Sequence, residues 1–231
     1  MIDSHERLSM LMPRNFLGLG HKKLSHIGDL TKPYFVAVGC SVVGGDSLSV
    51  DYKDSWVNQV AVGIGMEHIN LGFDGSSLEY QYEKIQQCEK ILPDSKFILW
   101  MQSPPWRSHH MRFRNVIGDG LARIKLDSAL YRNTESLAAQ WRKLLAFYDL
   151  AKKNTKILFT NTWMWDAPLL YLLESKMRKT CSRYHVNTKD IIDRGKDGLH
   201  PGPDTHKHLA TEMIQSVFTH FPQLKRKSVV K

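Results

Sequence analysis

Segments typical of short strands alternate with segments typical of helices along most of this chain, and this alternation limits its fold more than any other feature. The predicted strands lie at 34–38, 68–73, 96–101, 156–160 and 189–192. Apolar residues at helical spacing lie between and after them, at 55–65, 78–92, 134–153, 167–180 and 204–218. This order predicts βαβ units and an α/β domain with a mostly parallel sheet.

The length and charge of the chain point to one basic domain. Its 231 residues suffice for one α/β core and are few for two. We expect an N-terminal extension at 1–32, a domain at 33–222 and a basic C-terminal tail at 223–231. Lys and Arg number 32 against 23 Asp and Glu, a formal net charge of +9. The charges are spread out before the tail and no nucleic-acid-binding motif is present, so specific nucleic-acid binding is expected least.

Cysteine content and hydropathy predict a protein without a zinc site, a disulfide framework or a membrane span. Cys40, Cys88 and Cys181 match no zinc spacing, and an odd count closes no disulfide framework, so we expect three small buried side chains. No 18-residue apolar run is present, and the first residues do not form a secretory signal. We therefore expect the chain to act in the cytoplasm where it is made, or to be packaged into an assembly.

Two serines after the first predicted strand are candidate nucleophiles. Ser41 follows the strand directly, in Gly39-Cys40-Ser41, whereas Ser47 lies six residues further on in a Gly-Asp-Ser-Leu sequence. A serine just past a buried strand is held on a sharp turn, exposed for attack and close to a backbone N–H. Ligands of such sheets bind at the carboxyl ends of the strands, which favours Ser41. Alternatively, Ser41 is only a small polar residue in a tight turn.

Two further loops carry candidate groups. Gly75, after the second predicted strand, lets the backbone approach a ligand and point an N–H at it, although Ser76 or Ser77 could simply cap the next helix. Asp197 precedes His200 by three residues in a loop rich in Gly and Pro. Its carboxylate can accept a hydrogen bond from one imidazole nitrogen and orient the other as a general base. The alternative is a solvated loop before a helix.

Together these blocks resemble the SGNH hydrolases, also called GDSL-type esterases, over roughly residues 34–218. Gly39, Ser41 and Gly45 match the register of the family's first block, with Cys40 in place of its aspartate. The resemblance implies a doubly wound, mostly parallel five-stranded sheet with helices on both faces, as in flavodoxin-like folds. It also implies a role for each site residue: Ser41 as nucleophile and first oxyanion donor, Gly75 as second donor, His200 as base, and Asp197 as its orienting carboxylate.

The third block of the family departs from its pattern in this chain. The family has an asparagine there whose side chain is the third oxyanion donor, but the third predicted strand is followed by Gln102-Ser103-Pro104. Either Gln102 or Ser103 replaces the asparagine, or the site is weak, or the fold serves binding alone. Losing one such donor costs about 2.7–4 kcal/mol in the barrier.

Polar and aromatic residues near the strand ends are candidate substrate contacts. Arg107 belongs to a basic segment, at 107–114, that is either a solvated loop or a lid recognising anions. Asn70 and Asn161 end two strands, and Trp163 can stack on a sugar or pack in the core. His206 and His208 are two apart on a predicted helix and point away from each other, so no shared metal ion is expected.

The resulting hypothesis is a serine esterase that uses a Ser-His-Asp triad without a cofactor, acting on an ester such as an O-acetyl group of a polysaccharide. The rival is a non-catalytic protein of the same fold that binds a glycan or forms part of a virion, since the sequence looks like small phage-encoded members of the group. In that setting the N-terminal extension would contact the virion or another copy of the chain.

Overall fold

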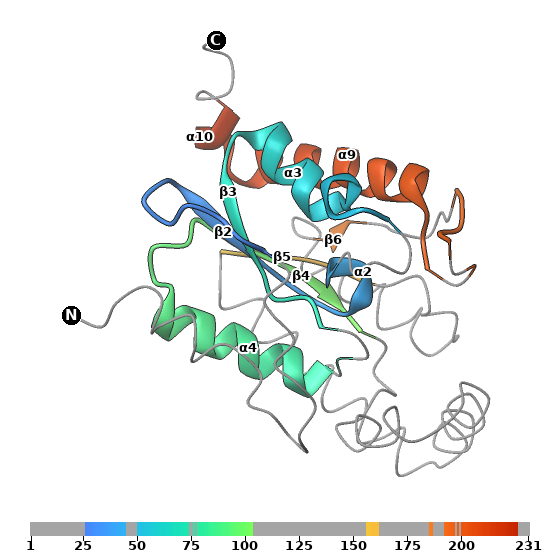
Figure 1. Cartoon of the computed structure of the whole chain (residues 1–231). Helices are drawn as coiled ribbons and strands as arrows, with labels where there is room; N and C mark the ends of the chain where they lie inside the picture. The colour runs from blue at the N-terminus through green and yellow to red at the C-terminus, as the bar shows by residue number, and fades with distance from the viewer. Residues whose placement is uncertain are drawn as a thin grey trace.

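A six-stranded sheet lies at the centre of the computed structural model, which describes residues 26–44, 50–73, 76, 78–103, 156–161, 185–186, 192–196, 198 and 200–225 (Figure 1). The strand order is β1-β3-β2-β4-β5-β6. All neighbours are parallel except β1 and β3. The strands are β1 (His26–Ile27), β2 (Tyr34–Val38), β3 (Glu67–Asn70), β4 (Ile98–Gln102), β5 (Ile157–Asn161) and β6 (His185–Val186).

The expected doubly wound, mostly parallel sheet of five strands is confirmed, with β1 added at one edge. β1 lies within the predicted N-terminal extension and pairs antiparallel with β3, through His26 opposite Asn70 and Ile27 opposite Ile69. The fifth parallel strand of the described residues is β6. Of the strand predicted at 189–192 only Ile192 is described, and it lies outside any strand.

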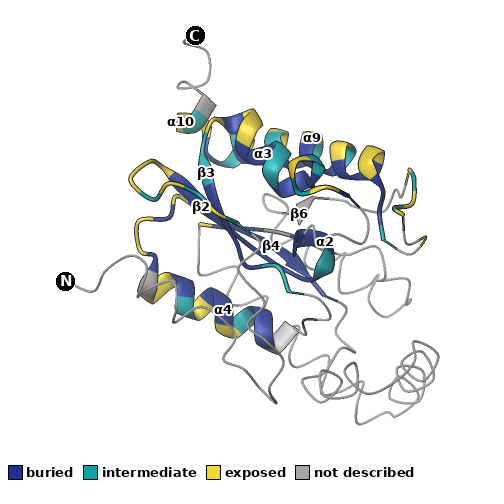
Figure 2. Cartoon of the chain, in the orientation of Figure 1, coloured by how far each residue is buried: buried dark blue, intermediate teal, exposed yellow. Residues whose placement is uncertain are grey.

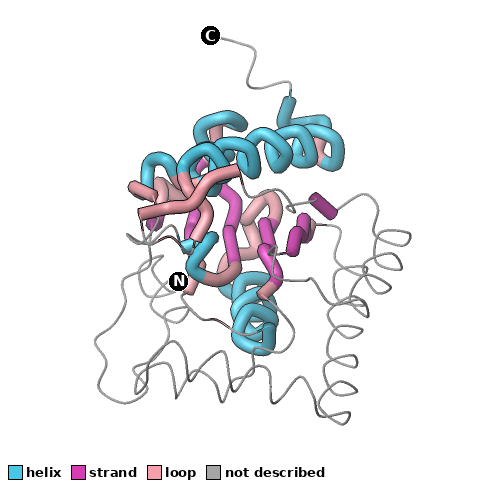
Figure 3. Tube along the Cα trace, turned by 90° about the vertical axis from the view of Figure 1, so that its right-hand side faces the viewer, coloured by secondary structure: helices cyan, strands magenta, loops and turns pink. Residues whose placement is uncertain are grey.

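Helices cover both faces of the sheet (Figures 1 and 3). α3 (Trp56–Ile64) and α9 (Pro203–His220) pack side by side over one face, and α4 (Leu78–Ile91) covers the other. Three short elements complete the described part: α2 (Ser41–Gly44), the 3-10 helix η1 (Tyr52–Asp54) and α10 (Pro222–Lys225). The helices predicted at 134–153 and 167–180 lie outside the described residues. Within the described residues, no helix has both the length and the apolar character needed to span a membrane.

Burial follows the pattern expected for a parallel sheet covered on both sides. All five residues of β2 and of β4 are buried, so neither strand shows the alternation of a half-exposed strand (Figure 2). Between this sheet and the α3/α9 layer lies a continuous apolar core, whose helical members include Trp56, Val57, Val60, Leu209, Met213 and Val217.

A buried histidine joins the two helices of this layer at their N-terminal ends. Nδ1 of His206 accepts a hydrogen bond of 3.0 Å from the backbone N–H of Trp56, the first residue of α3. The first turn of a helix has N–H groups with no partner inside the helix, and His206 satisfies one of them. Because His206 is fully buried, desolvation lowers its pKa to about 4. The imidazole is therefore neutral near pH 7 and carries its proton on Nε2.

A second buried histidine belongs to a group of stacked rings near the β1 edge. His68 of β3 is hydrogen-bonded to the hydroxyl of Tyr52 and stacks between His26 and Phe35, with ring centroids 4.4 Å and 5.5 Å away. Burial, helped by the neighbouring His26, lowers the pKa of His68 to about 4. His68 is therefore also neutral in the fold near pH 7.

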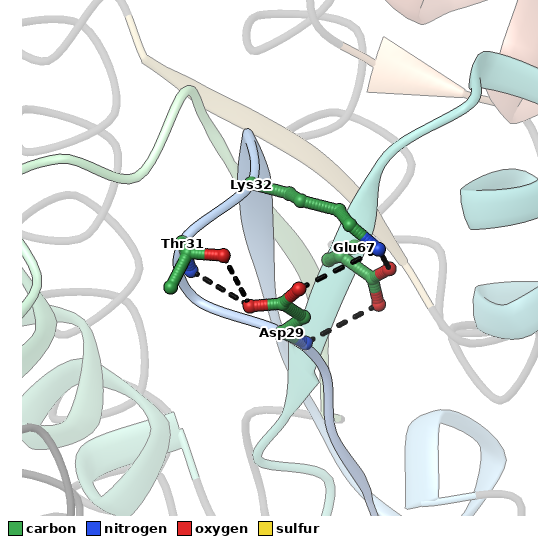
Figure 4. A network of polar contacts seen from close by, with 4 residues as sticks. All are labelled: Asp29, Thr31, Lys32 and Glu67. Carbon is green, nitrogen blue, oxygen red and sulfur yellow. Dashed lines mark hydrogen bonds and ion pairs between the residues drawn. The ribbon is translucent and has the colours of Figure 1, made fainter.

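Exposed charges close the turn between β1 and β2 (Figure 4). Lys32 Nζ lies 3.5 Å from carboxylate oxygens of both Asp29 and Glu67, and Asp29 also accepts hydrogen bonds from the backbone and hydroxyl of Thr31. Exposed pairs of this kind contribute little to stability, because water and salt screen the charges. They fix the turn geometry more than they stabilise the fold.

The two buried histidines predict a loss of stability in mild acid. Each has an unfolded pKa of 6.5 and a folded pKa of about 4, so the unfolded chain binds protons first as the pH falls. The free energy of unfolding should therefore fall between pH 6.5 and pH 4, by up to about 1.4 kcal/mol per pH unit for each histidine. Urea unfolding at several pH values measures this slope.

The variant His206→Asn separates the contribution of one histidine. Asparagine offers an acceptor oxygen close to the position of Nδ1 but does not titrate in this range. Its free energy of unfolding should depend on pH about half as steeply as that of the wild type. Equal slopes for the two proteins would contradict the assigned neutral state of His206.

Candidate active site

The order of the strands reverses between β2 and β4. From β2 the chain runs to β3, on one side of β2, and then crosses to β4 on its other side. In open α/β sheets such a reversal of strand order leaves a crevice where ligands bind. The residues that follow β2 include Ser41, and those that end and follow β4 are Gln102 and Ser103. Three predicted site residues therefore come to one edge of the sheet.

The turn after β2 needs a glycine at Gly39. A Cβ atom there would lie 2.3 Å from Cγ2 of Val43 and 3.0 Å from the carbonyl oxygen of Met101. The chain can therefore turn sharply and enter α2 at Ser41. Cys40 is buried in the turn, whereas Ser41 is partly exposed. Its side chain is thus accessible at the end of the strand, as expected for the position of a nucleophile.

Three contacts hold α2 in place. The indole Nε1–H of Trp56 donates to the carbonyl of Val42 at 3.0 Å, and Nδ2 of Asn70 donates to that of Val43 at 2.7 Å. Gly72 packs so closely on α2 that a Cβ atom would lie 2.2 Å from the backbone nitrogen of Gly44. Contacts from α3, β3 and the loop after β3 thus converge on the short helix that begins with Ser41.

Asn70, a predicted substrate contact, takes part in the fold instead of facing solvent. It is fully buried, and its Oδ1 accepts a hydrogen bond of 2.9 Å from the backbone N–H of Gly72. Both ends of the amide are therefore engaged with backbone groups around α2.

The side chains of Ser41 and His200 meet although 159 positions separate them in the sequence. Ser41 Oγ lies 2.8 Å from His200 Nε2, within the normal range of a hydrogen bond. Both residues are partly exposed. When Nδ1 carries the imidazole proton, the hydroxyl donates to Nε2, which is the arrangement in which a base can take the serine proton.

The segment before α9 projects His200 toward Ser41. Arg194 pairs with Pro201 in an isolated bridge, and the N–H of Gly195 donates to the carbonyl of His200 at 2.9 Å. Gly198 has φ of 68°, a left-handed conformation that favours glycine. The two ends of the segment are thus tied together, which fixes the backbone that carries His200.

Asp193 anchors this segment to α9. Gly202 occupies the N-cap and has no side chain to cap the helix. The carboxylate of Asp193 accepts instead from the backbone N–H groups of Thr205 and Asp204, at 2.8 Å and 3.2 Å, and from the Thr205 hydroxyl at 2.8 Å. Desolvation works to raise the pKa of Asp193, but these hydrogen bonds, with His206 nearby, outweigh it and hold the pKa below its ordinary value. In the sequence, Gly202-Pro203 indicates a helix start without a capping side chain, so a capping group from elsewhere in the chain could have been expected.

A glutamine of α4 connects the loops on the other side of the crevice. Nε2 of Gln81 donates to the hydroxyls of Ser76 and Ser103, at 2.9 Å and 2.7 Å. Its Oε1 accepts from the indole of Trp100 at 2.9 Å and from the backbone N–H of Ser103 at 3.2 Å. Ser76 in turn donates to the carbonyl of Gly39 at 2.9 Å. Sequence reasoning did not single out Gln81, because one polar residue on an amphipathic helix gives no signal.

The two candidates for the third oxyanion donor, Gln102 and Ser103, differ in their hydrogen bonding. Ser103 is bound to Gln81 through its hydroxyl and its backbone N–H. Gln102 is fully buried, and within the described part of the chain neither Nε2 nor Oε1 of its amide has a hydrogen-bond partner. A buried amide without partners costs about 1–3 kcal/mol, so its unused N–H groups call for a functional explanation.

Asn161, another predicted substrate contact, ends β5 and lies opposite Gln102 in the strand register. Four predicted site residues lie outside the described part of the chain: Asp197, Gly75, Arg107 and Trp163. The alternative nucleophile Ser47 lies outside it too.

Comparison with known proteins finds similar folds among solved structures but no similar sequence. No family model matches the sequence, and no curated protein sequence matches it either. An acetyl xylan esterase (Est2A) from the rumen bacterium Butyrivibrio proteoclasticus aligns with a TM-score of 0.51 at 13% identity, over 82% of this chain and 64% of that chain. The chain shares its fold with this esterase. It corresponds to about two thirds of the esterase's length, and the likeness at this identity concerns the fold alone.

Two other solved structures align at slightly lower scores. One is a protein from Desulfitobacterium hafniense DCB-2 whose name places it in the G-D-S-L family of lipolytic proteins, with a TM-score of 0.49 at 11% identity over 79% of this chain and 98% of that chain. The other is a family two carbohydrate esterase from Clostridium thermocellum in complex with cellohexaose, with a TM-score of 0.49 at 13% identity over 88% of this chain and 67% of that chain.

Removing the external cap of α9 should destabilise the fold. For Asp193→Ala we expect a loss of about 1 kcal/mol in the free energy of unfolding at pH 7, measured by urea denaturation. Asp193→Asn keeps one acceptor oxygen and should lose less. Because the pKa of Asp193 is lowered in the fold, its contribution is present above the ordinary value of 3.8 and disappears as the pH falls through the folded value. Equal stabilities of wild type and Asp193→Ala at pH 7 would exclude the capping role.

Proposed function

We propose that this protein is a serine ester hydrolase in which Ser41 is the nucleophile and His200 the general base. The observation that carries the proposal is the 2.8 Å contact between Ser41 Oγ and His200 Nε2 at the carboxyl end of the first parallel strand. A serine hydroxyl is a weak nucleophile unless an adjacent base accepts its proton. The fold shared with an acetyl xylan esterase supports the same reaction class.

The reaction proceeds through an acyl-enzyme. His200 Nε2 takes the proton of Ser41 as Oγ attacks the ester carbonyl and the carbonyl oxygen becomes an oxyanion. The tetrahedral intermediate collapses, and the protonated His200 gives its proton to the leaving alkoxide, which departs as the alcohol. Water, deprotonated by the same histidine, then attacks the acyl group and releases the carboxylic acid, with the proton returned to Ser41.

The proposed orienting group for His200 is Asp197. It precedes the histidine by three residues in the segment that Asp193 anchors. The carboxylate of Asp193 accepts hydrogen bonds from the first turn of α9, so it already has a structural role and leaves Asp197 as the candidate. Its part is to hold the tautomer with the proton on Nδ1 and to stabilise the imidazolium when it forms.

The proposed oxyanion donors are the backbone N–H groups of Ser41 and Gly75, with the amide of Gln102 as the third. Ser41 is the first residue of α2, and within the described part of the chain its N–H donates no hydrogen bond, as expected for a helix start. Gln102 is preferred to Ser103 because its N–H groups donate to no described residue, whereas Ser103 is bound to Gln81. Such donors act on the charge that develops in the transition state.

The proposed substrate is a small ester on a carbohydrate, such as an O-acetyl group of a polysaccharide. The neighbour with the shared fold is an acetyl xylan esterase, and predicted aromatic and basic contacts such as Trp163 and Arg107 suit a glycan. We also propose a virion as the setting for this activity, with the N-terminal extension at 1–32 as the contact.

Labelling with a fluorophosphonate probe tests the nucleophile directly. We expect the wild type to be modified at Ser41, and Ser41→Ala to remain unlabelled. His200→Ala should be labelled at least about 10⁴-fold more slowly, because the base is lost. Ser47→Ala is the matched control and should be labelled like the wild type, with the modified peptide identified by mass spectrometry.

Two outcomes of this experiment would contradict the proposal. Label on Ser47 would mean that the Gly-Asp-Ser-Leu serine is the nucleophile after all. A folded wild-type protein that takes no label would point to the non-catalytic glycan-binding or virion protein of the same fold.

A further inference from the structure

We propose that Gln81 is a positioning residue that fixes the oxyanion donors relative to the nucleophile. This inference rests on the proposed function, since it concerns the same crevice. Gln81 lies on α4, on the face of the sheet opposite α3 and α9, and its hydrogen bonds go to Ser76, Trp100 and Ser103. None of these three is among the groups proposed above to act on the substrate. Gln81 acts through the three loops that carry those groups.

The amide of Gln81 is fully used. Its two N–H groups reach two hydroxyls, and its oxygen accepts from one indole and one backbone N–H, all within 3.2 Å. Gln81, Ser76 and Ser103 are each completely buried. A satisfied buried network of this kind has one low-energy geometry, because any shift leaves a polar group without a partner in a low-dielectric interior.

The network joins the ends of three neighbouring strands. Ser103 follows β4 directly after Gln102, and Ser76 follows Gly75 in the loop after β3. Ser76 passes the connection to the turn after β2, where the carbonyl of Gly39 accepts from both the Ser76 hydroxyl and the backbone N–H of Phe73. One side chain thus connects Ser103, next to Gln102, with Ser76 in the loop after β3 and, through Ser76, with the turn that leads to Ser41.

The direction of the hydrogen bonds requires an amide at position 81. Ser76 donates its only hydroxyl hydrogen to Gly39, so it must accept from its other neighbour, and Nε2 of Gln81 provides that donor. Trp100 and the backbone of Ser103 are donors only, so they need the oxygen of the same amide. Neither a methionine nor an ionised glutamate meets both demands.

The test uses Gln81→Met and measures kcat and KM for 4-nitrophenyl acetate together with the rate of fluorophosphonate labelling at Ser41. Misplaced oxyanion donors weaken the transition state more than the bound substrate. We expect kcat and the labelling rate to fall about 10- to 100-fold, with KM changed less than about threefold. Ile85→Ala, on the same helix and fully buried but outside the network, is the control for lost stability.

Two further variants separate positioning from a general loss of structure. Ser76→Ala breaks the same connection to Gly39, so the double variant should lose little more activity than Gln81→Met alone. Gln81→Glu should regain activity relative to the wild type as the pH falls, because burial raises the pKa of the introduced carboxyl and its protonated form supplies one donor.

The outcomes distinguish this inference from the proposed function. A wild type that is not labelled at Ser41 overturns both. A labelled wild type with unchanged kcat in Gln81→Met overturns the role of Gln81 alone. The role of Gln81 is also overturned if Ile85→Ala, at an equal loss of stability, lowers kcat as much as Gln81→Met does. It is overturned as well if the effects of Gln81→Met and Ser76→Ala on kcat simply add in the double variant.

Discussion

The hydrogen bond from the backbone of Trp56 to His206 is the contact on which the geometry of the crevice depends. It fixes the start of α9 against the start of α3, over 150 positions of sequence. From Trp56 the indole reaches the carbonyl of Val42 in α2, the helix that begins with Ser41. From the start of α9 the chain leads back through Asp193 to the segment that carries His200. The proposed nucleophile, Ser41, and the proposed base, His200, are therefore both connected to this contact between two helix starts.

The apolar core keeps the starts of α3 and α9 in a fixed relative position. α3 and α9 pack along their lengths through side chains such as Val60, Leu209 and Met213, so the two helix starts cannot move apart independently. A small polar contact then selects one arrangement among those that the apolar surfaces permit. The opposite face of the sheet also combines packing with a polar contact. There the sheet fixes the strands, and Gln81 of α4 connects the loops that follow them.

Much of this arrangement could be predicted from the sequence because it depends on local pattern. Apolar runs such as 34–38 and 96–101 indicate buried parallel strands, and the rule that ligands bind at the carboxyl ends of strands directs attention to Ser41. The joining contacts could not be predicted, because Trp56 and His206, or Gln81 and Ser103, are brought together only by tertiary packing. Asn70 shows the same limit: its position after a strand suggested a substrate contact, whereas its amide binds the backbone of α2 and of the following loop.

The edge strand β1 has a consequence for the boundaries of the folding unit. It covers the free side of β3 with only two residue pairs and stacks His26 on His68. A chain that begins at residue 33, the start of the domain suggested by sequence pattern, would lack this cover and leave the polar backbone groups on the β1 side of β3 unpaired, while those facing β2 stay paired. Open sheet edges of this kind template pairing between molecules. The two residues of β1 therefore reduce the tendency of this sheet edge to pair with another molecule, in addition to completing the sheet.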